Sequence, residues 1–376
     1  MENIHTTLTF RLKAPNAQKV QITGDFLPTK QIDTPVGKYD APGVADLVKD
    51  DKGVWSFTST NLSPELYSYN LILDGVKIVD PGSVYITRDI TSETNIFILS
   101  DKKGDCGDLY TVNEVPHGNV SKVWYDSPTL KMQRRMTVYT PAGYDKGKDY
   151  PVLYLLHGAG GDEDAWTTLG RAQHILDNLI ATGKAKPMVV VMTNGNPNCQ
   201  AAPGEWSAGM YVPSFNGYQG AKAVATMDES FPDVMNYVES HYKVGKDKAH
   251  RAICGLSMGG GHSFDISRRF PNKFDYVGLF SAGLHVGKTG DFRTDFYKML
   301  QEDEEAKQQL ATLFKNKPKL YWIGMGKTDF LYKSTAGLRR YFDEKGYKYT
   351  YMETEGGHIW RNWRVYLTEV AQKIFK

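Results

Sequence analysis

The segment Gly255-Leu256-Ser257-Met258-Gly259 has the residue types and the spacing of a nucleophile elbow. It follows the apolar run 249–254, and a G-x-S-x-G segment between a buried strand and a helix makes a sharp turn in which glycines avoid collisions of Cβ atoms. Ser257 would then present its hydroxyl at the end of the strand. The helix beginning near Met258 would direct unpaired N–H groups at a developing oxyanion. Because the pattern also occurs by chance, its partners decide whether it predicts acyl-transfer chemistry.

An activated serine needs a base and a carboxylate that orients the base. Beside an elbow these follow the serine in the order acid, histidine, each after a strand. Asp329 follows the predicted strand 320–324, and His358 follows the predicted strand 348–352. Both would lie on loops at the sheet edge that carries the elbow. We therefore predict a catalytic triad of Ser257, Asp329 and His358.

Other side chains compete for these roles. His285 follows the next predicted strand after the elbow and is the one rival base. His157 precedes the serine, and the glycines beside it suggest a different role. His262 lies one turn into the elbow helix, where packing is the simpler interpretation. Glu353 and Glu355 flank the histidine loop but are too close to it in the chain to reach behind the imidazole ring.

The stretch His157-Gly158-Ala159-Gly160-Gly161 follows the predicted strand 152–156 and has the composition of an oxyanion loop. Glycines after a strand let the backbone approach a substrate with its N–H groups pointing inward. We predict one oxyanion donor at the N–H of Ala159 and the second at the N–H of Met258. A plain glycine turn is the alternative.

A Gly-, Pro- and Asn-rich stretch over residues 195–222 leaves a predicted strand on the catalytic side and exceeds the usual length of a connection. It is a candidate substrate wall. Trp166, Trp206 and Trp360 fall on predicted loops or helix starts near the catalytic edge, where flat aromatic surfaces could bind a phenolic ring or a sugar. Packing inside the protein is the alternative for each of them.

Composition excludes several classes of function. The 376 residues carry a formal net charge of +2 and no block of five Lys or Arg, so no nucleic-acid partner is expected. No apolar stretch approaches the ~20 residues that cross a bilayer, so no membrane partner is expected either. Residues 1–5 lack the regions of a signal peptide, which leaves the compartment open. Cys106, Cys199 and Cys254 are too few for a disulfide framework and too scattered for a metal site, and no metal or cofactor is expected.

Two parts of the chain have different patterns. Residues 6–99 alternate short apolar and polar runs between turn residues, which is typical of an all-β sandwich. A polar connector follows, and the remainder alternates buried strands with amphipathic helices, which is typical of a mostly parallel α/β sheet. We therefore predict a β-domain over residues 1–99, a linker over 100–118 and an α/β domain over 119–376. The expected strands are 8–12, 19–23, 54–58, 66–73, 95–99, 135–139, 152–156, 188–192, 249–254, 276–280, 320–324 and 348–352, and the expected helices are 172–182, 227–242, 259–269, 334–345 and 360–374.

The first domain resembles a known group of β-sandwich modules on four short segments, Gly24-Asp25-Phe26, Gly53-Val54-Trp55, the hairpin pair Asp74-Gly75, and Asp80-Pro81. They occur in the order found in the early-set immunoglobulin-like modules of carbohydrate-binding family 48. The resemblance implies an immunoglobulin-like sandwich of the kind appended to polysaccharide-active enzymes. Trp55 and Tyr69 could stack on sugar rings, but their alternation with apolar neighbours favours a place in the core or at a domain interface.

Four motifs occur together in the second domain, namely Gly255-Leu256-Ser257-Met258-Gly259-Gly260, Val138-Tyr139-Thr140-Pro141, Tyr150-Pro151-Val152-Leu153-Tyr154-Leu155-Leu156-His157-Gly158 and Gly356-Gly357-His358. Together they resemble the esterase-D-like α/β-hydrolases, in particular carbohydrate esterase family 1, which contains feruloyl and acetylxylan esterases. The resemblance implies an α/β-hydrolase fold and a Ser-His-Asp triad, carried here onto Ser257, His358 and Asp329. The stretch 195–222 does not map onto the family pattern.

The two resemblances together imply the layout of feruloyl esterases from xylan-degrading bacteria. They predict a secreted or periplasmic serine esterase that releases ferulate from feruloylated arabinoxylan or xylo-oligosaccharides. Acetylxylan and enterobactin-type siderophore esters are alternatives on the same scaffold. A catalytically inactive glycan-binding protein is the alternative from another class of function. The sequence does not determine the oligomeric state.

Overall fold

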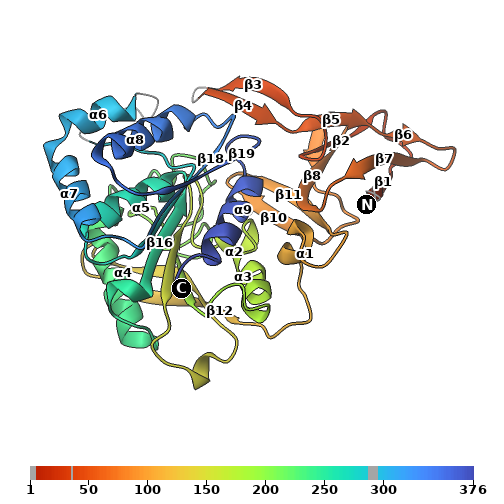
Figure 1. Cartoon of the computed structure of the whole chain (residues 1–376). Helices are drawn as coiled ribbons and strands as arrows, with labels where there is room; N and C mark the ends of the chain where they lie inside the picture. The colour runs from red at the N-terminus through yellow and green to blue at the C-terminus, as the bar shows by residue number, and fades with distance from the viewer. Residues whose placement is uncertain (1–5, 35–36, 287–294) are drawn as a thin grey trace. The chain divides into compact units, whose positions relative to one another are not determined.

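The computed structural model describes residues 6–34, 37–286 and 295–376. The chain divides into two compact units, one ending at Glu114 and one beginning at Val115, and each unit has a hydrophobic core of its own. Figure 1 follows the elements of both units along the chain.

Antiparallel strands make up most of the first unit. One sheet has the strand order β1 (Thr6–Lys13), β7 (Val54–Leu62), β6 (Val48–Lys49). A second sheet has the order β10 (Ile86–Asp89), β11 (Ser92–Leu99), β8 (Glu65–Leu73), β2 (Val20–Gly24), β5 (Gly43–Asp46), with β9 (Val76–Ile78) also paired to β8. The remaining pair is β3 (Lys30–Thr34) with β4 (Gly37–Ala41).

The core of the first unit draws its side chains from both larger sheets. Phe10 and Trp55 come from the first sheet, Ile22 and Leu71 come from the second, and all four are buried in one cluster. The Trp55 indole N–H donates to the carbonyl of Ala14 at 2.9 Å, so the ring is packed in the core and its N–H is hydrogen-bonded within the same unit. The all-β part of the predicted fold class is confirmed.

Two local features of this unit bear on the sequence predictions. Asp74 and Gly75 form the expected two-residue hairpin turn, with φ angles of +47° and +88° and with Leu73 paired to Val76. The connector after β11, expected to be irregular, contains the short helix α1 (Cys106–Tyr110). Asp105 caps this helix by accepting the N–H of Asp108 at 2.8 Å, and such a local cap stabilises a turn that apolar periodicity does not reveal.

An eight-stranded sheet forms the centre of the second unit. Its strand order is β12 (Asn119–Ser127), β13 (Met132–Thr140), β15 (Val189–Thr193), β14 (Val152–Leu156), β16 (Arg251–Leu256), β17 (Tyr276–Phe280), β18 (Leu320–Gly326), β19 (Thr350–Thr354). The pairs that involve β12 and β13 are antiparallel, and the pairs from β15 to β19 are parallel. The mostly parallel sheet predicted for this part of the chain is confirmed.

Helices cover both faces of this sheet. On one face lie α2 (Ala165–Thr168), α3 (Ala172–Ala181) and α9 (Trp360–Ala371). The others are α4 (Met227–His241), α5 (Met258–Arg269), α6 (Phe296–Glu302), α7 (Glu304–Lys315) and α8 (Tyr332–Lys345). In Figure 1 the sheet separates α3 and α9 from α4, α5 and α7.

Three helices and one strand of this unit were not expected from the sequence, namely α2, α6, α7 and β12. The strand expected from residue 249 begins at Arg251 instead. Residues Lys248–His250 form a single turn of 3-10 helix, in which Asp247 accepts the N–H of His250 at 3.2 Å. This side-chain cap competes with strand pairing for the same backbone donor, which explains the shift.

The carboxyl ends of the parallel strands bring the candidate functional residues to one edge of the sheet. His157 directly follows β14, Ser257 directly follows β16, and Asp329 and His358 lie in the loops after β18 and β19. Ligands of α/β sheets bind at this edge, outside the carboxyl ends of the strands.

Candidate active site

Ser257 has the strained backbone expected of a nucleophile elbow. Its φ and ψ angles are +51° and −115°, a region that non-glycine residues rarely occupy. Three backbone hydrogen bonds hold it there: its N–H donates to Phe280 at 2.9 Å, and its carbonyl accepts from Gly261 at 3.0 Å and Gly283 at 2.9 Å. Ser257 is the N-cap residue of α5. The sharp strand-to-helix turn that the sequence predicts is therefore present.

The elbow glycines are required by the backbone that surrounds them. A Cβ atom on Gly255 would lie 2.3 Å from the carbonyl oxygen of Gly259. A Cβ atom on Gly259 would lie 2.5 Å from the carbonyl oxygens of both Leu156 and His157. Real Cβ atoms do not approach backbone oxygens so closely, so the first turn of α5 can pack against the end of β14 only with glycine at position 259.

Asp329 and His358 form a hydrogen-bonded pair. His358 Nδ1 lies 2.9 Å from Asp329 Oδ2 and 3.1 Å from Oδ1. The Asp329 side chain is fully buried, and its Oδ1 also accepts the N–H of Leu331 at 2.9 Å. A carboxylate that accepts from Nδ1 fixes the imidazole with its lone pair on Nε2, as a general base requires.

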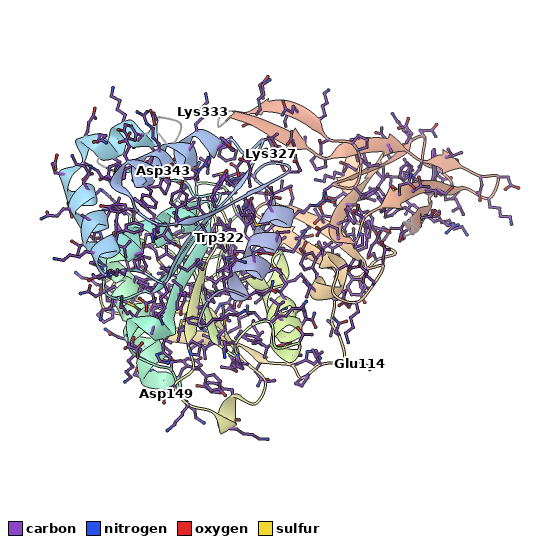
Figure 2. The ribbon with its side chains drawn as sticks, viewed as in Figure 1. Glu114, Asp149, Trp322, Lys327, Lys333 and Asp343 are labelled. Carbon is purple, nitrogen blue, oxygen red and sulfur yellow. The ribbon has the colours of Figure 1, made fainter. Side chains whose placement is uncertain are left out.

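Backbone pairing positions the two loops that carry this pair. Beyond the β18–β19 ladder, Lys327 N–H donates to Thr354 at 2.9 Å and Thr328 N–H donates to Gly356 at 3.0 Å. An ion pair between Lys327, which is labelled in Figure 2, and Glu355 joins the same two loops on their exposed side. Asp329 and His358 are therefore held by a continuation of the sheet.

Aromatic rings enclose the imidazole of His358. Its ring centroid lies 4.5 Å from that of Phe330 and 4.9 Å from that of Trp363, which meets it edge to face. Buried Asn362 donates to the carbonyl of Gly357 at 2.9 Å and so fixes the residue before the histidine. The side chain of His358 stays 12% exposed, which leaves a path from solvent to the ring.

The glycine loop after β14 makes a turn beside the serine. Gly161 N–H donates to Gly158 at 3.1 Å and Gly160 has a φ of +74°, which together define a type II turn with Ala159 at its first central position. A Cβ atom on Gly158 would lie 3.2 Å from Ser257 Cβ, so this turn, the predicted oxyanion turn, lies against Ser257. Met258 is the first residue of α5 and has no carbonyl one turn earlier to accept its N–H.

His157 supports the oxyanion turn from inside the protein. It is 2% exposed, its Nδ1 lies 2.7 Å from the carbonyl oxygen of Gly158, and its Nε2 accepts the N–H of Gly195 at 2.7 Å. Burial lowers the pKa of His157, so its ring is neutral with the proton on Nδ1. The rival base considered above, His285, is exposed to solvent, whereas His358 is the histidine joined to Asp329.

One contact of a serine triad is not formed in this structure. Among the described residues no hydrogen bond joins Ser257 to His358. Such contacts are often long in unliganded active sites and shorten when substrate binds.

Comparisons with known proteins assign the second unit to a protein family. A family model described as "Putative esterase" matches residues 127–374. The chain belongs to this esterase family. The match contains Ser257, Asp329 and His358, and it places the second unit among the carboxylic-ester hydrolases.

Individual relatives of this chain are also named as esterases. An endo-1,4-beta-xylanase/feruloyl esterase from Xylanibacter ruminicola is 30% identical over 387 aligned residues, which cover 100% of this chain and 46% of the relative. The chain thus spans less than half the length of that protein. A solved ferulic acid esterase is 26% identical, with a TM-score of 0.55 over 68% of this chain and 97% of its own. The enterobactin esterase of Shigella flexneri, 13% identical, shares the fold over 98% of this chain and 93% of its own, with a TM-score of 0.61. The resemblance to feruloyl-type esterases is confirmed.

The three tryptophans expected to contact substrate have different surroundings. Trp166 is 1% exposed, donates its N–H to Leu156 at 2.9 Å and meets Phe280 and Trp360 edge to face. No face of its ring remains for a ligand, so the expectation for Trp166 was wrong and this residue belongs to the core. Trp360 and Trp206 are partly exposed and stay candidates.

The segment 195–222 has neither helix nor strand, and side chains organise it instead. The ring of Tyr218 lies 5.1 Å from that of Trp206 and 5.0 Å from that of Tyr211. Asn198 ties the two ends of the segment together by donating to the carbonyl of Tyr218 at 2.6 Å. Three apolar side chains project into solvent over the middle of the segment: Met210, Val212 and Phe215.

Sequence reasoning missed a buried polar network beneath this segment. Arg134 donates to the carbonyls of Asn194, Asn196 and Cys199, and Arg135 pairs with Glu163 at 2.7 Å. The available signal was two adjacent arginines in the middle of an otherwise buried strand, because such residues are rarely buried without partners.

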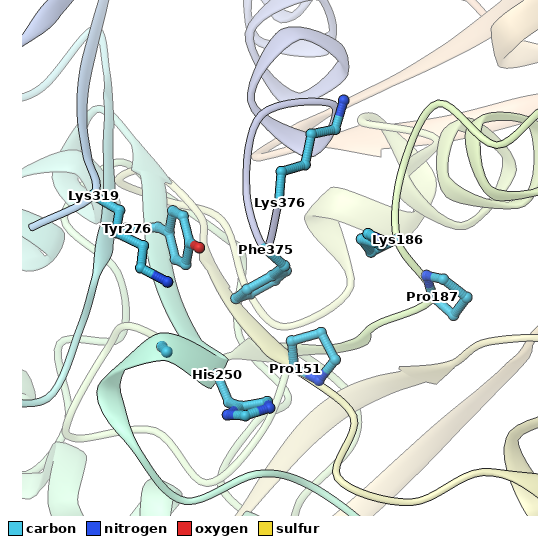
Figure 3. Close-up of a pocket in the computed structure, with 9 residues that line it drawn as sticks. Pro151, Lys186, Pro187, His250, Tyr276, Lys319, Phe375 and Lys376 are labelled. Carbon is cyan, nitrogen blue, oxygen red and sulfur yellow. The ribbon is translucent and has the colours of Figure 1, made fainter.

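Two surface hollows lie away from the candidate site. One of about 330 Å³ is found at the amino ends of the parallel strands, where Pro151, His250 and Phe375 are among its lining residues (Figure 3). The other, of about 360 Å³, lies between β12 and α4. None of the three candidate triad residues lines either hollow.

Among the described residues no three His, Cys, Asp or Glu side chains form a possible metal site, and no described helix is long and apolar enough to cross a membrane.

The elbow geometry gives a prediction for stability. Gly259→Ala should lower the unfolding midpoint markedly, because its Cβ would lie 2.5 Å from two backbone oxygens at the end of β14. Overpacking against backbone costs about 1–3 kcal/mol or more. Gly283→Ala is the matched control, since the nearest atom to its Cβ would be at 3.6 Å, and it should stay within ~2 °C of wild type. Thermal unfolding by circular dichroism measures both, and equal midpoints would contradict the close contact.

Proposed function

We propose that the second unit hydrolyses carboxylic esters through an acyl-enzyme, with Ser257 as nucleophile, His358 as general base and acid, and Asp329 as the residue that orients His358. The observation that carries the proposal is the hydrogen bond between Asp329 and His358 at the sheet edge where Ser257 leaves β16 in a strained conformation. Membership of the esterase family supports it.

The chemistry proceeds in two similar halves. Ser257 Oγ attacks the ester carbonyl carbon while His358 Nε2 takes the hydroxyl proton. The resulting oxyanion accepts hydrogen bonds from the N–H groups of Ala159 and Met258. The carbon–oxygen bond to the alcohol then breaks, and His358 returns the proton to the departing alcohol oxygen. Water, deprotonated by the same imidazole, attacks the acyl-enzyme, releases the acid and restores Ser257. No step draws on a metal or a cofactor.

Ferulate is the acyl group that the surroundings of the site support best. Trp206, Tyr211 and Tyr218 form an aromatic cluster in the segment 195–222, and Trp360 lies two residues after His358. Aromatic rings of this kind bind a flat phenolic ring through stacked or edge-to-face contacts. A feruloyl esterase name for the relative that aligns with 100% of this chain supports the same substrate.

Feruloylated arabinoxylan or its oligosaccharides are the proposed natural substrates. Because a polysaccharide such as arabinoxylan does not cross the cytoplasmic membrane, the proposal places the enzyme outside the cytoplasm, either secreted or periplasmic. The first unit is proposed to be a glycan-binding module of the immunoglobulin-like kind. Trp55 and Tyr69 are both buried, at 8% and 6% exposure, so any glycan contact of that unit must use other side chains.

The first test measures hydrolysis of methyl ferulate and of an acetyl ester of similar reactivity. We expect a higher kcat/KM for methyl ferulate, and we expect Ser257→Ala to reduce kcat for both esters by about 10⁴-fold or more while the protein remains folded. Preference for acetate would favour an acetylxylan esterase. Retention of activity in folded Ser257→Ala would rule out Ser257 as nucleophile. Absence of hydrolysis, with xylan binding by the wild type in affinity gels, would favour an inactive glycan-binding protein.

The aromatic cluster gives a prediction for specificity. Trp206→Ala should raise KM for methyl ferulate by about tenfold. Removing an aromatic side chain that packs on a ligand typically costs about 1–2 kcal/mol of binding free energy. KM for the acetyl ester should change by less than about twofold. Trp124→Ala is the control, because Trp124 is 44% exposed and lies on β12, outside the segment 195–222. Equal KM changes for both esters would show that Trp206 only supports the fold.

A further inference from the structure

Glu163 lies two residues after the oxyanion turn and is the acceptor at the centre of the buried network described above. Its side chain is completely buried, and it receives three N–H groups: Arg135 Nε at 2.7 Å and Ala202 N at 2.9 Å on Oε1, and Asn194 Nδ2 at 2.9 Å on Oε2. Two of these donors belong to the segment that runs from the end of β15 into the proposed substrate wall. Glu163 thus joins the wall to the residues that follow the oxyanion turn.

A second link closes a ring around the turn. Asn194 Oδ1 accepts from both the backbone N–H and the side-chain amide of Asn196, at 2.9 Å and 3.0 Å. Asn196 Nδ2 in turn donates to the carbonyl oxygen of Gly161 at 3.1 Å. The backbone from Gly161 through Asp162 to Glu163 completes a ring of five residues, and one member of the ring, Gly161, is the last residue of the oxyanion turn.

Burial makes the pattern of donors and acceptors strict at the Glu163 end of this ring, whereas Asn196 and Gly161 are partly exposed. Arg135 is 5% exposed and Asn194 is 2% exposed, so a lost partner there cannot be replaced by bulk water. An unpaired buried polar group is unfavourable, and the ring can restore its pairing by shifting the turn. A shift of about 1 Å in an oxyanion donor reduces the rate by as much as about 100-fold.

We propose that Glu163 is a positioning residue for the reaction: through Asn194 and Asn196 it fixes the oxyanion turn at Gly161 and, through Ala202, the start of the substrate wall. Glu163 touches neither the substrate nor Ser257 in this role. The inference rests on the proposed function, because it assumes that the N–H of Ala159 stabilises an oxyanion.

The structure offers a donor–acceptor exchange as the test. In Glu163→Gln an amide N–H₂ replaces one acceptor oxygen and faces a donor of Arg135, Ala202 or Asn194. In Asn194→Asp a second carboxylate faces Glu163. The double variant Glu163→Gln/Asn194→Asp restores a donor opposite an acceptor at the same net charge as wild type, and the remaining oxygen of residue 194 still accepts from Asn196.

Each variant is assayed with p-nitrophenyl acetate, an ester that makes no demand on a phenolic pocket. Each is also tested for inhibition by phenylboronic acid, which binds a nucleophilic serine as a tetrahedral adduct with an oxygen at the oxyanion position. We expect Glu163→Gln to lower kcat by about 10- to 100-fold while KM stays within about twofold of wild type. The inhibition constant of phenylboronic acid should rise by the same factor by which kcat/KM falls. The double variant should recover most of both losses.

Glu239→Gln is the matched control, because Glu239 pairs with the buried Arg251 at 2.6 Å at the amino end of β16, away from the candidate site, and its kcat should stay within about twofold of wild type. The unfolding midpoint of each variant shows whether a lower activity comes from a smaller folded fraction or from a lower kcat of the folded protein. Wild-type kcat in Glu163→Gln, or a folded double variant without recovery, would overturn the positioning role alone. A wild-type protein that hydrolyses neither this ester nor methyl ferulate would overturn the proposed function as well.

Discussion

The contact between the first turn of α5 and the end of β14 is the constraint on which the candidate site depends. Gly259 approaches the carbonyl oxygens of Leu156 and His157 so closely that no side chain fits between them. This contact brings Ser257 against Gly158 and places the beginning of α5 beside the oxyanion turn. Because both sides of the contact are backbone, one in α5 directly after β16 and the other at the end of the neighbouring β14, the spacing of Ser257 and the proposed oxyanion donors does not depend on flexible side chains. Donors that are in place before the reaction need no reorganisation when charge develops.

The remainder of the site divides between the sheet and the loops. Asp329 and His358 lie in loops that continue the pairing of β18 with β19, so backbone hydrogen bonds hold the two side chains that are proposed to move protons. The segment 195–222 has no such support, and its aromatic side chains depend on buried polar contacts with Arg134, Arg135 and Glu163. A rigid scaffold for the chemistry and a loop for recognition is the usual division in enzymes of this kind, because loops can vary without disturbing the core.

The sequence predicted those features that local geometry determines. Glycine spacing identified the elbow, and strand patterns placed Asp329 and His358 after neighbouring strands, where the structure forms their hydrogen bond. Trp166 was misplaced, because its burial depends on Phe280, a residue far away in the chain. The pair of Arg135 and Glu163 was missed for the same reason, since the two are 28 positions apart and only the folded sheet brings them together. Long-range packing of this kind leaves no periodic signal in the sequence.

Direct trapping of the acyl-enzyme is the measurement closest to the central claim, which is that Ser257 carries the acyl group during turnover. The protein would be mixed with methyl ferulate, quenched in acid during the first turnovers, and digested for peptide mass spectrometry. As this claim requires, we expect a feruloyl group on the peptide that contains Ser257, and on Ser257 itself after fragmentation. A feruloyl group on a different residue, or turnover of the ester with no covalent intermediate on any peptide, would contradict it.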